Sequence, residues 1–144
     1  VTTLVMEPTT AMPDLIDQLR SRGITPTKQR ITIADVLFQK KQHVSADQLL
    51  DIVRREDATV SRATVYNTLN LFLNKKLIKA LIIDKSKVVY DTNTSIHHHI
   101  YNVETGELID VSPEDLGLSE LPHLSGFEVE GADVVIRVRR THSA

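Results

Sequence analysis

The sequence predicts an α+β protein made of two parts, a helical part that ends in a β-hairpin and a smaller part that is mostly β. Apolar residues recur at helical spacing through residues 14–74, and the period then changes to two. Residues 92–95 are polar and lack a period, which is typical of a hinge. We therefore expect two domains, residues 14–91 and 96–144, and we interpret residues 1–13 as a disordered leader.

The first domain is expected to begin with three helices. The first spans residues 14–22, because its apolar residues share one face and Gly23 can end a helix. Thr25-Pro26 is expected to open the second helix, since proline is tolerated at the first helical position. Ser45 and Gln48 stand at the spacing of a capping box, which predicts the start of the third helix.

A fourth helix, which Ser61 can cap, has two distinct faces. Its apolar residues point inward, and its outward face is polar but uncharged. The inward residues are Val65, Leu69, Phe72 and Leu73, and the outward residues are Ala63, Tyr66, Asn67, Asn70 and Asn74. Residues 77–83 and 87–91 then have the pattern of two strands around a turn. Three of these helices, followed by such a hairpin, are in the order of a winged helix-turn-helix domain.

The second domain shows short β patterns. Strands are expected over residues 97–103, 107–111, 127–129 and 134–138, and a short helix over residues 113–119. A chain of 144 residues that forms two small cores is usually stabilised by a partner or a metal. We therefore expect this small C-terminal α/β domain to mediate a homodimer.

Charge divides between the two halves, although the net charge of the chain is only -2. Residues 14–90 contain 14 Lys and Arg against 8 Asp and Glu, whereas residues 91–144 contain 3 against 10. A basic half suits phosphate, and an acidic half with histidines suits cations. Cysteine is absent, which excludes disulfides and thiolate zinc sites. No apolar run approaches the ~20 residues of a membrane span, so we expect a cytoplasmic protein without a membrane partner.

The outward face of the fourth helix has the side chains of a DNA-reading helix. Its Tyr and Asn residues can hydrogen-bond to base edges, while nearby cations can contact phosphates. The alternative is an ordinary solvated amphipathic helix, but the basic hairpin with Lys79, Lys85 and Lys87 favours DNA. The residues expected to contact double-stranded DNA are Lys28, Arg30, Arg62, Tyr66, Asn67 and Asn70.

The run His97-His98-His99 predicts a metal site. Alternate residues of a strand share a face, so His97 and His99 can bind one ion while His98 points the other way. The nearest carboxylates are those of Asp91 and Asp110, and His43 can complete the set. Imidazole and carboxylate ligands without thiolate suit Fe(II), Mn(II) or Zn(II), with Zn(II) the strongest competitor by intrinsic affinity. The alternative is a solvated triplet or an adventitious metal patch.

These motifs resemble the ferric uptake regulator family, in the family's order and spacing over nearly all of residues 14–140. They are GITPTKQR (23–30), HVSA (43–46), ATVYNTL (63–69), Tyr90-Asp91, the HHH run and GELID (106–110). The resemblance implies a DNA-binding transcriptional regulator. It implies a regulatory metal site at His43, Asp91, His97, His99 and Asp110, and DNA-reading positions at Arg30, Arg62, Tyr66 and Asn67.

The stretch DTNTSIHHH and the tail VVIRVRR are most similar to the iron response regulator branch of that family. That branch implies haem as the signal, with His97, His98 and His99 as candidate haem ligands or as a second metal site. The family's structural zinc uses CxxC pairs, whereas Asn102 and Thr105 stand at the first pair here. No structural cysteine-zinc site is therefore expected.

The same residues are also compatible with other functions. Aspartate at both Asp91 and Asp110 also resembles the peroxide-sensing branch, in which bound Fe(II) oxidises a ligand histidine, and manganese- or zinc-responsive branches share the same ligands. A hydrolytic enzyme is disfavoured, because the chain has no recognised nucleophile motif and carries a separate DNA-reading domain. A metal- or haem-binding protein without DNA contact would leave the basic helix and hairpin without a role.

We hypothesise that the ligand set spans the hinge, because His43 and Asp91 precede it while His97, His99 and Asp110 follow it. Binding would fix the angle between the domains and set two DNA-reading helices of a homodimer across a pseudo-palindromic operator. In the branch resembled, haem implies loss of activity, so repression of iron homeostasis genes would prevail when iron is scarce.

Overall fold

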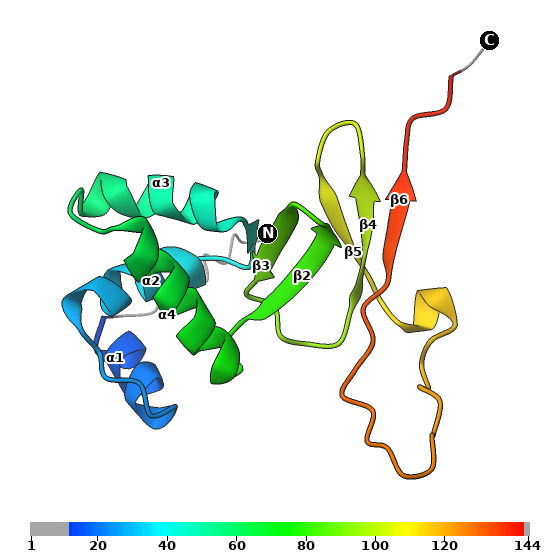
Figure 1. Cartoon of the computed structure of the whole chain (residues 1–144), viewed down its shortest axis with the longest axis horizontal. Coiled ribbons are helices and arrows are strands. Elements are labelled where there is room, and N and C mark those ends of the chain that lie inside the picture. The colour runs from blue at the N-terminus through cyan, green and yellow to red at the C-terminus, as the bar shows by residue number, and fades with distance from the viewer. Residues whose placement is uncertain (1–11, 143–144) are drawn as a thin grey trace, which may run out of the picture. The chain divides into compact units, whose positions relative to one another are not determined.

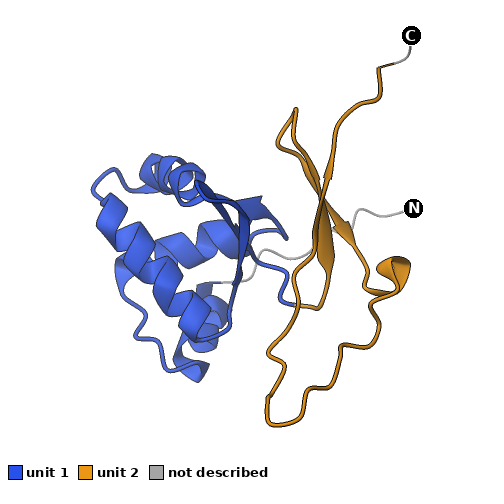
Figure 2. Cartoon of the chain, turned by 45° about the vertical axis from the view of Figure 1, so that its right-hand side comes forward, with its two compact units in different colours: residues 1–94 blue, residues 95–144 orange. Residues whose placement is uncertain are grey.

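The computed structural model describes residues 12–142 of the chain. The chain divides into two compact units, whose boundary in the sequence is between Thr94 and Ser95, within the expected hinge (Figure 2). Of the expected leader, residues 1–11 lie outside the described residues, and Met12 and Pro13 belong to the first helix. None of the helices in residues 12–142 combines the length and the apolar character needed to cross a bilayer.

Four helices form most of the described part of unit 1 (Figure 1). They are α1 (Met12–Ser21), α2 (Lys28–Phe38), α3 (Ala46–Glu56) and α4 (Arg62–Asn74). α2 packs against α1, α3 and α4, and α3 packs against α4. Their apolar faces meet in one core, whose fully buried side chains include Leu15, Ile33, Leu49, Leu69 and Phe72. Burial of each such side chain stabilises the fold by about 1.5–3 kcal/mol.

Side chains cap α3 and α4 as predicted. Ser45 Oγ accepts a hydrogen bond from Gln48 N at 3.1 Å, and the Gln48 side chain accepts one from Ser45 N at 2.9 Å. This reciprocal pair confirms the capping box of α3. Ser61 Oγ accepts a hydrogen bond from Thr64 N at 3.0 Å, which confirms the cap of α4.

The first two helices begin at other residues than those predicted. α1 starts at Met12, because proline is tolerated in the first turn of a helix. α2 starts at Lys28, because the Thr27 hydroxyl accepts a hydrogen bond from Arg30 N at 3.3 Å and so caps the helix. The prediction that Thr25-Pro26 opens this helix is therefore wrong.

A three-stranded antiparallel sheet completes unit 1, in the order β1-β3-β2. β2 (Lys79–Asp84) and β3 (Lys87–Asp91) form the predicted hairpin. β1 (His43–Val44) pairs with β3, and the pairing places His43 opposite Asp91. Two residues are too few to show a period, so the sequence pattern does not predict β1. Helices followed by this hairpin have the winged-helix order.

Unit 2 contains a second three-stranded sheet, in the order β5-β4-β6. Its central strand β4 (His98–Asn102) pairs antiparallel with β5 (Leu108–Val111) and parallel with β6 (Val135–Val138). A short 3₁₀ helix, η1 (Glu114–Leu116), follows β5. The two units together confirm the predicted α+β class.

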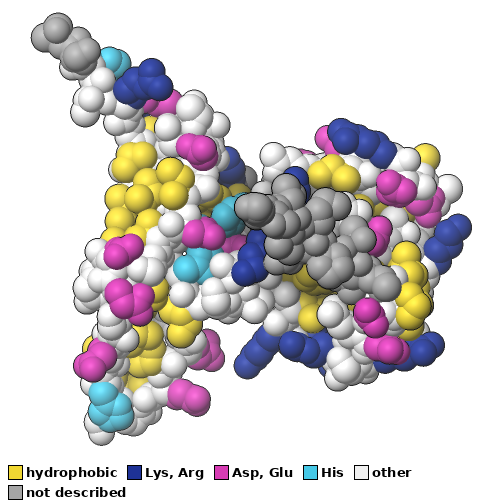
Figure 3. Space-filling model, turned by 180° about the vertical axis from the view of Figure 1, so that it is seen from behind, with side chains coloured by type: hydrophobic (Ala, Val, Ile, Leu, Met, Phe, Trp, Pro, Cys, Tyr) yellow, Lys and Arg dark blue, Asp and Glu magenta, His cyan; other side chains and the backbone are white. Residues whose placement is uncertain are grey.

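The strand predicted over residues 127–129 does not form, and this prediction is wrong. Phe127 is 70 % exposed and Val129 is 44 % exposed. A strand needs a neighbour to pair with, and an alternation over three residues is too short to indicate one. Exposed hydrophobic side chains also include those of Ile109, Leu124 and Val138, and Figure 3 shows such side chains along this unit, interspersed with acidic ones.

Candidate metal centre and DNA-reading helix

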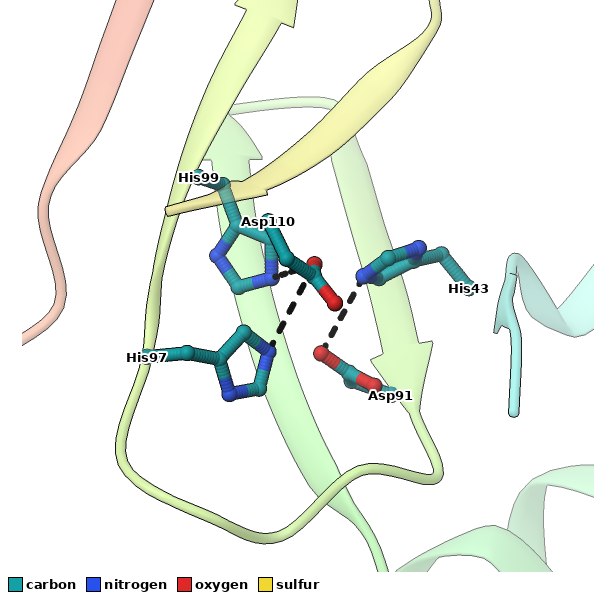
Figure 4. A group of neighbouring side chains, drawn as sticks. All are labelled: His43, Asp91, His97, His99 and Asp110. Atoms are coloured by element: carbon teal, nitrogen blue, oxygen red, sulfur yellow. Dashed lines mark ion pairs between the residues drawn. The ribbon is translucent and has the colours of Figure 1, made fainter. Parts of the chain in front are cut away.

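Unit 1 brings His43 and Asp91 together. They face each other across the pairing of β1 with β3, and His43 Nε2 lies 3.2 Å from Asp91 Oδ2 (Figure 4). Asp91 is buried, and its Oδ1 accepts a hydrogen bond from Asn93 N at 2.8 Å. That bond orients the carboxylate so that Oδ2 faces the imidazole. Unit 1 therefore presents one imidazole and one carboxylate as neighbouring ligands.

Unit 2 brings His97, His99 and Asp110 together. His99 lies opposite Asp110 in the pairing of β4 with β5. Asp110 Oδ1 lies 3.5 Å from His99 Nε2 and 3.7 Å from His97 Nε2, as the dashed lines in Figure 4 mark. The two imidazole rings have their centroids 4.6 Å apart. Both histidines thus direct Nε2 to one carboxylate, although β4 begins only at His98 and His97 lies just before it.

A backbone carbonyl orients the ring of His97. His97 Nδ1 lies 2.7 Å from Ser95 O, so its N–H donates to that carbonyl. The neutral ring then has no proton on Nε2, which is the atom that faces Asp110. Histidines that bind metals commonly donate their other N–H in this way, which fixes the tautomer and the ring orientation. The hydrogen bond therefore prepares Nε2 as a ligand.

The donor atoms of both sets suit a divalent transition metal. Each set offers imidazole nitrogen and carboxylate oxygen. Thiolate is excluded, because the chain has no cysteine. Mixed sets of this kind suit Fe(II), Mn(II) and Zn(II). The residues present therefore fit a bound metal ion.

His98 is the member of the histidine run that neither set includes. Alternation along β4 puts it on the opposite side of the strand from His99. It is only 1 % exposed, and its Nδ1 accepts a hydrogen bond from Val134 N at 3.0 Å. A haem site or second metal site at His97, His98 and His99 stays a prediction.

The turn between β4 and β5 is held by side chains where the resemblance implies a cysteine pair. Asn102 Oδ1 accepts hydrogen bonds from Glu104 N at 2.9 Å and from Thr105 N at 3.2 Å. Thr105 Oγ1 accepts one from Glu107 N at 3.2 Å. Such side-chain bonds to nearby amides stabilise tight turns. Asn102 and Thr105 therefore hold this turn by side-chain hydrogen bonds.

α4 exposes the face that the sequence predicts to read DNA. The outward residues Ala63, Tyr66, Asn67, Asn70 and Asn74 are all exposed. Of the predicted inward residues, Val65, Leu69 and Phe72 are buried and Leu73 is half-buried, while Thr68 is buried in addition. The hydroxyl of threonine is small enough for an inward position, which the apolar pattern does not reveal.

The cations predicted to contact phosphate lie near the start of α2 and α4. Lys28 is exposed, and Arg30 Nη1 donates to Thr25 O at 3.0 Å. Arg62 forms an ion pair with Asp47 of α3, and the hydrogen bond and then the charge of Asp47 raise the pKa of Arg62. Sequence reasoning missed Asp47, because only packing of α3 against α4 brings this carboxylate to Arg62.

Comparison with known proteins identifies relatives. Residues 21–137 match the model of the ferric uptake regulator family. The chain is 30 % identical over 120 residues to the peroxide-responsive repressor PerR of Staphylococcus aureus, which covers 82 % of this chain and 81 % of that protein. It is similar to the ferric uptake regulator of Pseudomonas aeruginosa with manganese, with a TM-score of 0.71, 27 % identity and coverage of 88 % and 97 %. It is also similar to the ferric uptake regulator of Francisella tularensis with iron, with a TM-score of 0.67, 26 % identity and coverage of 82 % and 92 %.

A winged helix with an exposed polar helix face, in one chain with imidazoles and carboxylates that could hold a metal, is typical of metal-responsive DNA-binding transcriptional regulators. The family match extends over both units. The chain belongs to the ferric uptake regulator family.

Replacement of Asn102 tests whether its side chain stabilises the turn between β4 and β5. We expect Asn102→Ala to lower the free energy of unfolding by about 1 kcal/mol, because two backbone N–H groups lose their acceptor. Thermal unfolding of the metal-free protein measures this loss. Asn102→Asp keeps the Oδ1 acceptor and is expected to retain most of the stability. An unchanged midpoint for Asn102→Ala would show that the turn does not depend on this side chain.

Proposed function

We propose that the protein is a homodimeric repressor that binds double-stranded DNA in response to a divalent metal, and that it acts by binding rather than as an enzyme. The observation that carries this proposal is the presence of preformed metal ligands on both sides of the hinge. Unit 1 supplies His43 and Asp91, and unit 2 supplies His97, His99 and Asp110.

We infer that the two sets bind one ion together. Unit 1 offers two ligand residues and unit 2 offers three, whereas metal ions in proteins take four or more ligands. Only residues 92–96 separate Asp91 from His97 in the chain, a segment that spans about 20 Å at most. The family resemblance maps the regulatory metal site onto these same residues. One site with ligands from both units satisfies all three observations.

Fe(II), Mn(II) and Zn(II) are the candidate ions. The solved relatives named above contain manganese in one case and iron in the other. Zinc binds such ligands most tightly among the three, so the metal that is available in the cell also decides which one is bound.

Metal binding would act through the hinge. A bound ion would supply positive charge, and the imidazoles and carboxylates of the two ligand sets would hold it. His43 and Asp91 then restrain the DNA-reading unit, and His97, His99 and Asp110 restrain the other unit. In a homodimer, this restraint sets the two α4 helices at the spacing of a pseudo-palindromic operator. Metal shifts DNA affinity only by as much as it favours this arrangement over others.

DNA recognition is assigned to the exposed face of α4. Tyr66, Asn67 and Asn70 are placed to contact base edges in the major groove. Lys28, Arg30 and Arg62 are placed to contact phosphates, and the lysines of the β2–β3 hairpin add positive charge.

Unit 2 is assigned to dimerisation. Contiguous patches of exposed apolar side chains mark contacts with another protein, and exposed apolar side chains lie along this unit (Figure 3). Ile109 is 48 % exposed, Leu124 57 % and Val138 38 %. A second copy of the same unit would cover such side chains and enlarge a core that is small for an independent domain.

Replacement of two histidines tests the metal site. We expect His97→Ala with His99→Ala to remove most binding of Mn²⁺, because both Nε2 ligands of unit 2 are lost. Isothermal titration of the metal-free protein, prepared without a histidine tag, measures the affinity. His123→Ala is the matched control, since His123 is exposed and outside both sets. Stoichiometric tight binding by the double variant would place the sensor elsewhere.

Replacement of two α4 residues tests DNA recognition. We expect Tyr66→Ala with Asn67→Ala to weaken operator binding by about 1–3 kcal/mol for each side chain that reads a base edge, while the dimer mass is unchanged. Gel retardation at fixed salt, on an operator selected from a random DNA library by the wild-type protein, measures the change. Gln18→Ala removes an exposed amide side chain from α1, outside the face assigned to DNA, and serves as control. Equal operator affinity for the double variant and the control would refute the assignment.

Peroxide sensing is a second candidate function. The similarity to a peroxide-responsive repressor favours it, and so does aspartate at both carboxylate positions. This function predicts that hydrogen peroxide, added to the Fe(II)-loaded protein, increases the mass of a peptide containing His43 or His97 by one oxygen atom. The Mn(II)-loaded protein, treated identically, is the control. Peptides of unchanged mass would exclude peroxide sensing and leave metal or haem as the signal.

A further inference from the structure

We propose that His98 is a positioning residue, whose imidazole anchors β6 to β4, the strand that contains His99 and begins directly after His97. This inference rests on the proposed metal-binding function, since the positioned residues are His97 and His99. It assigns a role to the one histidine of the run that neither ligand set uses.

The anchor consists of two hydrogen bonds to one residue. Val134 N donates to His98 Nδ1 at 3.0 Å, and Val134 O accepts from His99 N at 3.0 Å. Val134 immediately precedes β6, and the ladder then continues with His99 opposite Val135. The His98 ring therefore binds the N–H at the point where β6 joins β4.

This geometry leaves His98 without a free ligand atom. A ring nitrogen that accepts an N–H hydrogen bond carries no proton, so the neutral His98 ring has its proton on Nε2. Nδ1 is occupied by Val134 and Nε2 is a donor. His97 has the reverse arrangement, because its Nδ1 donates to Ser95 O. Neighbouring histidines of one run are thus prepared for different roles.

The hydrogen bond between Val134 and His98 matters because the chain just before β6 has few other structural restraints. Residues 117–134 contain neither helix nor strand, and most of them are exposed. β4 is the central strand, so its two edges are held by β5 and β6. Loss of the β6 edge would loosen β4, and His97 and His99 flank the anchoring residue. Groups that orient metal ligands typically change metal affinity by about tenfold to hundredfold when removed.

Two substitutions at His98 separate positioning from ligation. Asparagine places Oδ1 where the histidine has Nδ1, so His98→Asn keeps an acceptor for Val134 N but offers no imidazole. His98→Leu removes the acceptor and fills the buried position with an apolar side chain. We expect Mn²⁺ affinity, measured by isothermal titration, to fall about tenfold or more in His98→Leu and to stay near the wild-type value in His98→Asn.

A third variant tests the hydrogen bond between Val134 N and His98 Nδ1 by changing its donor. Val134→Pro removes the donor N–H and leaves His98 intact, so we expect it to weaken Mn²⁺ binding as His98→Leu does. Hydrogen exchange of the metal-free protein gives a readout independent of metal. Amides of residues 135–138 are expected to exchange faster in His98→Leu and Val134→Pro, and at the wild-type rate in His98→Asn.

The outcomes distinguish the proposals. Equal loss of Mn²⁺ affinity in His98→Asn and His98→Leu, with wild-type affinity in Val134→Pro, would show that His98 is a ligand and overturn the inference. Wild-type affinity and exchange in His98→Leu would overturn it as well. A wild-type protein that binds no Mn²⁺, Fe²⁺ or Zn²⁺ would refute the proposed function, while the exchange rates would still decide whether His98 anchors β6.

Discussion

Cross-strand pairing is the constraint on which the candidate metal centre depends. The register of β1 with β3 places His43 opposite Asp91, and the register of β4 with β5 places His99 opposite Asp110. Backbone hydrogen bonds therefore bring His43 to Asp91 and His99 to Asp110, in two separate sheets. A slip of one residue in either pairing would turn its ligand to the other face of the sheet. The ligand sets are consequently as stable as the sheets that carry them.

Each carboxylate has imidazole partners before any ion is present. Asp91 is paired with His43 and oriented by Asn93 N, and Asp110 lies near His97 and His99. Asp91 is buried, and a buried carboxylate is costly unless it is paired and hydrogen-bonded, so its contacts with His43 and Asn93 stabilise it, whereas Asp110 is exposed to solvent. Under the proposed function, a bound ion would replace these contacts, and its affinity would depend on the difference between the contacts with and without the ion.

The sequence predicts most helices and strands, and it predicts the kinds of side chain at the candidate metal site. Both predictions depend on local sequence patterns. Helical periods, the serine caps and the histidine alternation each involve residues a few positions apart. What it misses depends on distant partners or on short signals. β1 has two residues, the Asp47–Arg62 pair joins separate helices, and the Val134 bond to His98 crosses 36 positions. The strand predicted around Phe127 is wrong for the opposite reason. The local apolar alternation is present, but in the described chain no strand lies beside it to pair with.

Within unit 1, a short and rigid series of contacts joins the proposed metal ligand His43 to α4, the helix proposed to read DNA. His43 lies in β1, and Ser45 directly after this strand forms the capping box that starts α3. α3 packs on α4, and its Asp47 pairs with Arg62 at the start of the reading helix. Close-packed cores transmit displacement rather than absorbing it. Under the proposed function, a metal bond at His43 would therefore act on unit 1 as one body.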